Sequence, residues 1–181
     1  MGLLAVLRSK VIKEEKAPEA VEELEDPISM LRRKILCALE YTGNYQEVLI
    51  ENGRIAEVET MEKFARERVR DALIHAGFAV APLEFAKSMW GDACFDAVGV
   101  SSRYLVVGEV KWGEEVTERE VESLISRTVK AEKSCRGREI IFFVASLKKL
   151  GESIKGKLES HPKRSFVVSF EEVRPYPVSG K

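Results

Sequence analysis

The sequence is poor in the residues that build disulfide frameworks and structural zinc sites. It has three cysteines and two histidines among 181 residues, and no two cysteines form a CxxC pair. An odd number of widely spaced cysteines argues against a disulfide scaffold, and so few ligands argue against a structural zinc site. This cysteine usage is typical of a reducing compartment, so we expect a cytoplasmic protein.

Long apolar runs and an excess of positive charge are also missing. The opening run MGLLAVL is too short for a signal peptide or a membrane span, so no membrane association is expected. The net charge is −1, so no global basic field indicates nucleic-acid binding. Any contact with nucleic acid would have to use a local basic patch.

A chain of this length suits one domain with an appended arm. We expect residues 1–26 to be the arm, because its stretch EEKAPEAVEELED is rich in acids and suits a solvated helix or a flexible segment. An acidic tail that binds a partner is the alternative. The domain would then span 27–181, with a helical lead-in over 27–58, a core over 59–146, and a C-terminal helix and strand over 147–181.

Hydrophobic periodicity predicts elements in the order α-β-β-β-α-β with trailing elements. Helices are expected in DPISMLRRKILCALEYTGN, ETMEKFARERVRDALIHAGF, VTEREVESLISRTVKAEKSCRG and LKKLGESIKGKLES; strands are expected in FAVAPL, in both halves of CFDAVGVSSRYLVVGEVKW, in REIIFFVAS and in SFVVSF. Gly43-Asn44 is expected to end the first helix and Gly77 the second, while Thr117 and Glu120 form a capping box. The pattern predicts an α/β fold with a mixed sheet.

One nucleotide-binding motif is discounted. GESIKGKL satisfies GxxxxGK, but Leu158 stands where a phosphate loop needs Ser or Thr for its magnesium. Leu147, Leu150 and Ile154 precede it at helical spacing, which a phosphate loop cannot have. A helix without nucleotide is expected here.

Two apolar strands each carry an acid in their interior. If residues 101–104 form a four-residue hairpin loop, Val100 pairs with Leu105, and the same register sets Asp96 opposite Glu109. Two facing carboxylates repel each other and would destabilise the sheet on their own. A hard divalent cation between them would remove the repulsion.

This placement suggests a site for Mg²⁺ or Mn²⁺. Asp96 and Glu109 would bind the ion, and the backbone carbonyl of Val110 would add a ligand. Lys111 lies on the same face as Glu109 and would orient a water nucleophile or neutralise charge on a phosphodiester. The alternative is an ion pair among the three side chains with no metal.

These residues resemble the PD-(D/E)xK nuclease superfamily of restriction enzymes and Holliday-junction resolvases. The resemblance rests on the helix before GFAV, on FDAV and on YLVVGEVK, and the spacing of Asp96 and Glu109 looks like that of archaeal junction resolvases. A closer similarity is to the nuclease-like C-terminal domain of a family of archaeal ATPases, in DPISML, VLIENG, GEVKW, VKAEK and FFVAS, from about Asp26 to Ser146. It implies a restriction-endonuclease-like core (αβββαβ), a central mixed sheet flanked by helices, and Mg²⁺-dependent cleavage of DNA.

The chain departs from the family at one position. Active members carry a further glutamate on the first helix, and the alignment of AGFAV puts Arg66 there. Glu62 lies one turn earlier on roughly the same face and could substitute as a catalytic residue. The helix that follows GEVKW flanks the site in related nucleases; on it Arg127, Lys130 and Lys133 are candidates for contacts with DNA phosphates, and a solvated helix face is the alternative.

The sequence supports two hypotheses about function. The first is a metal-dependent nuclease that hydrolyses DNA phosphodiester bonds as an endodeoxyribonuclease. The second is a catalytically inactive nuclease-fold module for DNA binding or protein interaction, associated with an archaeal ATPase-type system. Its partner would be another protein or a second copy of the chain.

Overall fold

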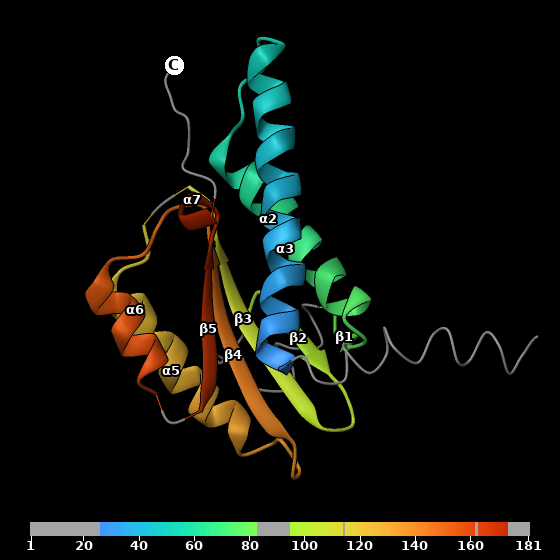
Figure 1. Ribbon diagram of the computed structural model, residues 1–181, viewed down its shortest axis with the longest axis vertical. Coiled ribbons are helices and arrows are strands. Elements are labelled where there is room, and N and C mark those ends of the chain that lie inside the picture. Colours follow the sequence, from blue (N-terminus) through green and yellow to red (C-terminus); the bar gives the residue numbers. More distant parts are fainter. Residues whose placement is uncertain (1–25, 83–94, 114, 162, 174–181) are drawn as a thin grey trace, which may run out of the picture.

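The structure is a computed structural model that describes residues 26–82, 95–113, 115–161 and 163–173. The arm expected over residues 1–26 lies, except for Asp26, outside these residues. The described part forms one five-stranded sheet with helices on both of its faces (Figure 1).

The sheet has the strand order β1-β2-β3-β4-β5. The strands are β1 (Ala79–Val80), β2 (Ala97–Val100), β3 (Tyr104–Lys111), β4 (Glu139–Ser146) and β5 (Arg164–Ser169). The first three pair antiparallel, whereas β3, β4 and β5 run parallel to one another. The mixed sheet of an α/β protein is therefore confirmed. The segment FAVAPL contributes only two residues to it among those described.

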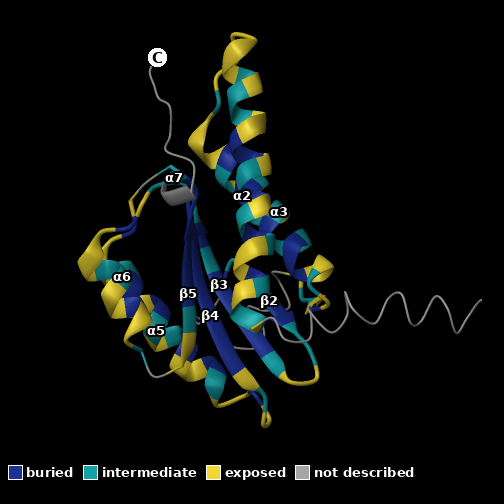
Figure 2. Ribbon diagram, viewed as in Figure 1, coloured by how far each residue is buried: buried dark blue, intermediate teal, exposed yellow. Residues whose placement is uncertain are grey.

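Helices cover both faces of the sheet. They are α2 (Pro27–Glu51), α3 (Val58–His75), α5 (Glu118–Glu132), α6 (Glu152–Glu159) and α7 (Phe170–Val173). Helices α2 and α3 pack on one face, and α5 and α6 pack on the other, so that the sheet separates two apolar clusters. Figure 2 shows the buried strands between helices whose outer surfaces are exposed.

Strand β4 is the most enclosed element. Each of its residues after Glu139 is buried, on both faces of the sheet. This confirms the prediction from the apolar run REIIFFVAS, because a central parallel strand covered by helices on both sides needs apolar residues at successive positions.

The predicted helices are present, but some of their boundaries differ from the prediction. The capping box of Thr117 and Glu120 is present at the start of α5, and Gly77 follows α3 with a φ of 97°. Helix α6 starts only at Glu152, later than the segment LKKLGESIKGKLES suggested. Among the described residues, no helix has the length and apolar composition needed to cross a membrane.

The helix stop expected at Gly43-Asn44 is wrong, because α2 continues to Glu51. Gly43 is buried against the ring of Phe170, and a Cβ atom at this position would lie 2.8 Å from Cζ of that ring. The glycine therefore makes room for an aromatic side chain from the other end of the chain. The helix ends instead before Gly53, which has a φ of 71°.

Two glycines inside helices should respond oppositely to alanine. Gly43→Ala should destabilise the protein by about 1–3 kcal/mol, because the added methyl group must displace the buried ring of Phe170. Gly156→Ala in α6 meets nothing within 4 Å and should stabilise by about 0.5–1 kcal/mol through helix propensity. Urea unfolding of both variants measures the difference; equal effects of the two substitutions would contradict this account of Gly43.

Candidate active site

The register of the β2–β3 hairpin sets the two acids against each other. Val100 pairs with Leu105 and Ala97 with Gly108, as the four-residue loop predicted. Just before β2, the Asp96 N–H donates to the carbonyl of Gly108 at 3.0 Å. Asp96 therefore lies beside Glu109, which confirms this part of the sequence prediction.

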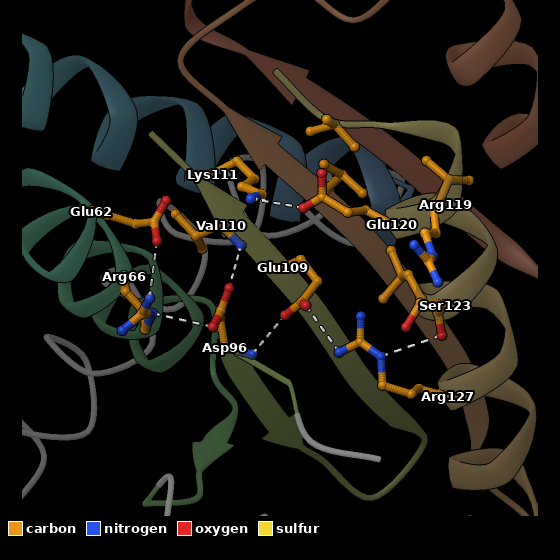
Figure 3. A pocket seen from close by; sticks show the side chains of 14 residues that line it. Glu62, Arg66, Asp96, Glu109, Val110, Lys111, Arg119, Glu120, Ser123 and Arg127 are labelled. Atoms are coloured by element: carbon orange, nitrogen blue, oxygen red, sulfur yellow. Dashed lines mark hydrogen bonds and ion pairs between the residues drawn. The ribbon is translucent and has the colours of Figure 1, made fainter. Parts of the chain in front are cut away.

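Strand β3 extends past the start of β2, and carboxylates take the place of the missing strand. The Val110 N–H donates to Asp96 Oδ2 at 2.8 Å, and the Trp112 N–H donates to Glu62 Oε2 at 3.1 Å. A buried backbone N–H needs an acceptor, so each acid satisfies a group that the sheet leaves without a strand partner. Figure 3 shows Asp96 and Glu62 reaching this edge from different elements.

The side chain of Glu109 lies on the face of β3 that α5 covers. Its Oε2 accepts the Asp96 N–H at 3.1 Å, and its Oε1 lies 2.9 Å from Nη1 of Arg127. Burial, followed by the negative charge of Asp96, raises the pKa of Glu109 from 4.5 to about 7, and the opposing effect of Arg127 is smaller. The carboxylate is thus held in surroundings that disfavour its charge.

Arg66 occupies the place where the resemblance implies a glutamate. Its Nε lies 3.2 Å from Asp96 Oδ1, and its Nη2 lies 3.4 Å from Glu62 Oε1. The guanidinium therefore bridges a carboxylate of α3 and the acid at the start of β2. Glu62 lines the same pocket, and its carboxylate is engaged with Arg66 and with the Trp112 N–H.

Lys111 lies on the same side of β3 as Glu109 and is held by an acid that the sequence did not assign to the site. Its Nζ lies 2.7 Å from Oε2 of Glu120, whose other oxygen accepts the Thr117 N–H in the capping box. Partial burial acts to raise the pKa of Glu120, but the hydrogen bonds from Lys111 and Thr117 prevail and lower it. Sequence spacing showed only the capping role of Glu120.

All these side chains line one pocket of about 420 Å³ between α3, β3 and α5. Sequence analysis missed Arg119 and Ser123, which line it from α5. Together with Arg127 they follow at intervals of four residues, which is the spacing of one helix face. Lys130 is exposed and Lys133 follows the end of α5, and neither lines the pocket. The structure therefore separates Arg127 from the other two residues proposed to contact DNA.

The pocket has as many acidic as basic lining residues. Its ionisable lining residues are the acids Glu62, Asp96, Glu109 and Glu120 and the bases Arg66, Lys111, Arg119 and Arg127. In the described part of the chain, no group of three or more His, Cys, Asp or Glu side chains is arranged to hold a metal ion. Asp96 and Glu109 offer neighbouring carboxylate oxygens, which are hard ligands of the kind that Mg²⁺ uses alongside water and phosphate.

Comparisons with known proteins add no relative, since no family model, no curated protein and no solved structure matches the chain. The similarity to PD-(D/E)xK nucleases therefore stays a prediction based on the motif residues.

The raised pKa of Glu109 makes stability depend on pH. In the folded protein the carboxyl keeps its proton up to about pH 7, whereas the unfolded chain releases it near 4.5, so between these values the folded state binds more protons. Stability should then fall as the pH rises from about 5 to 8, by up to about 3 kcal/mol from this group. Glu109→Gln should be more stable than the wild type at pH 8 and similar at pH 5.

Urea unfolding at both pH values tests this, with Glu122→Gln as a control. Glu122 is an exposed residue of α5 that pairs with Lys157, and it does not line the pocket. A pH profile of Glu109→Gln as steep as that of the wild type would show that another group causes the dependence.

Proposed function

We propose that this chain is a metal-dependent nuclease with a restriction-endonuclease-like core, and that it hydrolyses phosphodiester bonds of DNA. The observation that carries the proposal is the placement of Asp96 beside Glu109, with Lys111 on the same strand face as Glu109, in one pocket. The order of elements from α3 to β4 agrees with the αβββαβ plan of such a core.

The donor atoms suit a small divalent cation. Asp96 and Glu109 would hold Mg²⁺ or Mn²⁺, with the carbonyl of Val110 as a third protein ligand. When bound, such an ion polarises a phosphoryl oxygen and makes bound water more acidic. Two carboxylates that repel each other, one of them with a raised pKa, become favourable in that role.

Lys111 is the candidate for stabilising charge on the substrate. Its ammonium group shares the pocket with both carboxylates but pairs with Glu120, which stands on α5. A flexible lysine can move from that partner to a phosphate oxygen, where it would neutralise the charge that develops during water attack. Glu120 keeps its hydrogen bonds to Thr117 in either case.

The second candidate is a non-catalytic nuclease-fold module that binds DNA or a protein. The ion pair of Arg66 with Asp96 favours it, because a cation from the chain itself already neutralises the candidate metal ligand. Arg66 also stands where active members of the superfamily place a glutamate. The two candidates differ in whether a divalent ion binds at Asp96 and Glu109.

Metal binding should appear as a gain in thermal stability. Millimolar Mg²⁺ or Mn²⁺ should raise the melting temperature of the wild type, since a ligand that binds only the folded state stabilises it. Glu109→Gln should lose this response, and Glu122→Gln should keep it. A shift of equal size in all three proteins would remove the argument for an ion at this site.

Catalysis should depend on Lys111 separately from metal binding. Lys111→Met should reduce cleavage of a DNA duplex in Mn²⁺ by at least about a hundredfold, the lower range for loss of a charge-stabilising group. It should keep the metal-dependent rise in melting temperature. Lys157→Met, on the exposed surface of α6, is the matched control. DNA binding without any cleavage by the wild type would favour the non-catalytic module.

A further inference from the structure

Two arginines of the pocket lie next to the carboxylates where a cation would bind. Arg66 contacts Asp96 at 3.2 Å and Arg127 contacts Glu109 at 2.9 Å (Figure 3). The two arginine side chains are only 27% and 18% exposed. A guanidinium group with so little exposure keeps little of its hydration, so a nearby anion stabilises its charge.

A divalent cation cannot simply be added to this arrangement. When all four acids are ionised they balance the four bases, so an added ion would leave the pocket with two excess positive charges. The ion would also lie beside two guanidinium groups that contact its own ligands. Both effects oppose binding of the ion as long as Arg66 and Arg127 have no other anion.

A nucleic-acid phosphate is an anion of suitable chemistry. Each phosphodiester carries one negative charge and two free oxygens, which match the planar donor fork of a guanidinium. Arg127 is well placed to change partners, because its Nε donates to the carbonyl of Ser123 at 3.3 Å and its guanidinium lies over the ring of Phe95. Both contacts anchor the side chain apart from the Nη1 atom that contacts Glu109.

We propose that Arg66 and Arg127 make binding of a divalent cation at Asp96 and Glu109 depend on binding of a DNA phosphate in the same pocket. This inference rests on the proposed function. Without DNA the arginines compete with the cation for the carboxylates. When a phosphate enters, they transfer to its oxygens and leave the carboxylates to the cation. Such coupling is reciprocal, so the cation strengthens DNA binding by the same factor.

Arg119 completes the path by which a phosphate would reach the arginines. It lines the pocket from the exposed part of α5, two helical turns before Arg127, and Ser123 lies between them on the same face. Within the described residues Arg119 forms no ion pair. An exposed guanidinium at this position attracts a polyanion toward the more enclosed arginines.

The test measures Mn²⁺ affinity with and without DNA. The wild type, Arg66→Met and Arg127→Met are titrated with Mn²⁺ alone and when saturated with a 12-base-pair DNA duplex, and binding to the duplex itself is subtracted. Arg68→Met is the control, since Arg68 stands on the same helix as Arg66 and pairs with Asp71 outside this pocket. Thermal unfolding of each variant confirms that it is folded.

Two results are expected. DNA should tighten Mn²⁺ binding to the wild type by at least about tenfold, within the usual range of coupling between two ligands. Without DNA, Arg66→Met and Arg127→Met should each bind Mn²⁺ at least about fivefold more tightly than the wild type, and DNA should then add less. Arg68→Met should behave as the wild type. The two arginines lie on different helices, so either variant decides the question if the other does not fold.

Different results would contradict the coupling and the proposed function. Equal Mn²⁺ affinity of the wild type with and without DNA, or no tightening in either methionine variant, would overturn the coupling and leave the metal site standing. Absence of Mn²⁺ binding in the wild type and in every variant, with and without DNA, would overturn the proposed function and the coupling together.

Discussion

The pocket depends on the unequal lengths of two neighbouring strands. Strand β3 continues beyond its pairing with β2, and the N–H groups of Val110 and Trp112 then need acceptors that no strand supplies. Asp96 and Glu62 supply them, which brings two carboxylates to the end of β3 that β2 leaves unpaired and favours a compensating cation. Arg66 meets that requirement by contacting both acids. A shortage of backbone hydrogen-bond partners thus concentrates charge in the pocket that helices from both faces of the sheet line.

Much of the fold could be predicted because its determinants are local. The hairpin register follows from loop length and alternation, the start of α5 from a capping box, and the burial of β4 from an unbroken apolar run. The extent of α2 could not be predicted in this way. Gly43 has the sequence signature of a helix end, and only the ring of Phe170, far away in the chain, explains why it is a packing position instead. Tertiary contact decided the outcome there over local preference.

In the candidate site too, local sequence placed some residues and tertiary packing placed the others. Asp96 opposite Glu109, and Lys111 on the same face, follow from the period of a strand, so the sequence was sufficient to place them. The arginine partners were not predictable, because each contact joins a helix to a strand and depends on the packing of that helix against the sheet. The position of Arg119 on the pocket face of α5 shows the same limit, since spacing defines a face but not the direction in which it points.

The hydrogen bond of Asp96 to the backbone has a consequence for the history of such a chain. Its carboxylate ends a β-ladder whether or not an ion ever binds, and Glu62 does the same for the next N–H. Selection for folding alone would therefore preserve both acids in a lineage that had lost the chemistry. The acidic part of the motif can therefore persist without the proposed activity. The ammonium group of Lys111 contacts Glu120 and, as a donor only, cannot accept a strand N–H, so its retention or loss among descendants would be the more informative record of the proposed catalysis.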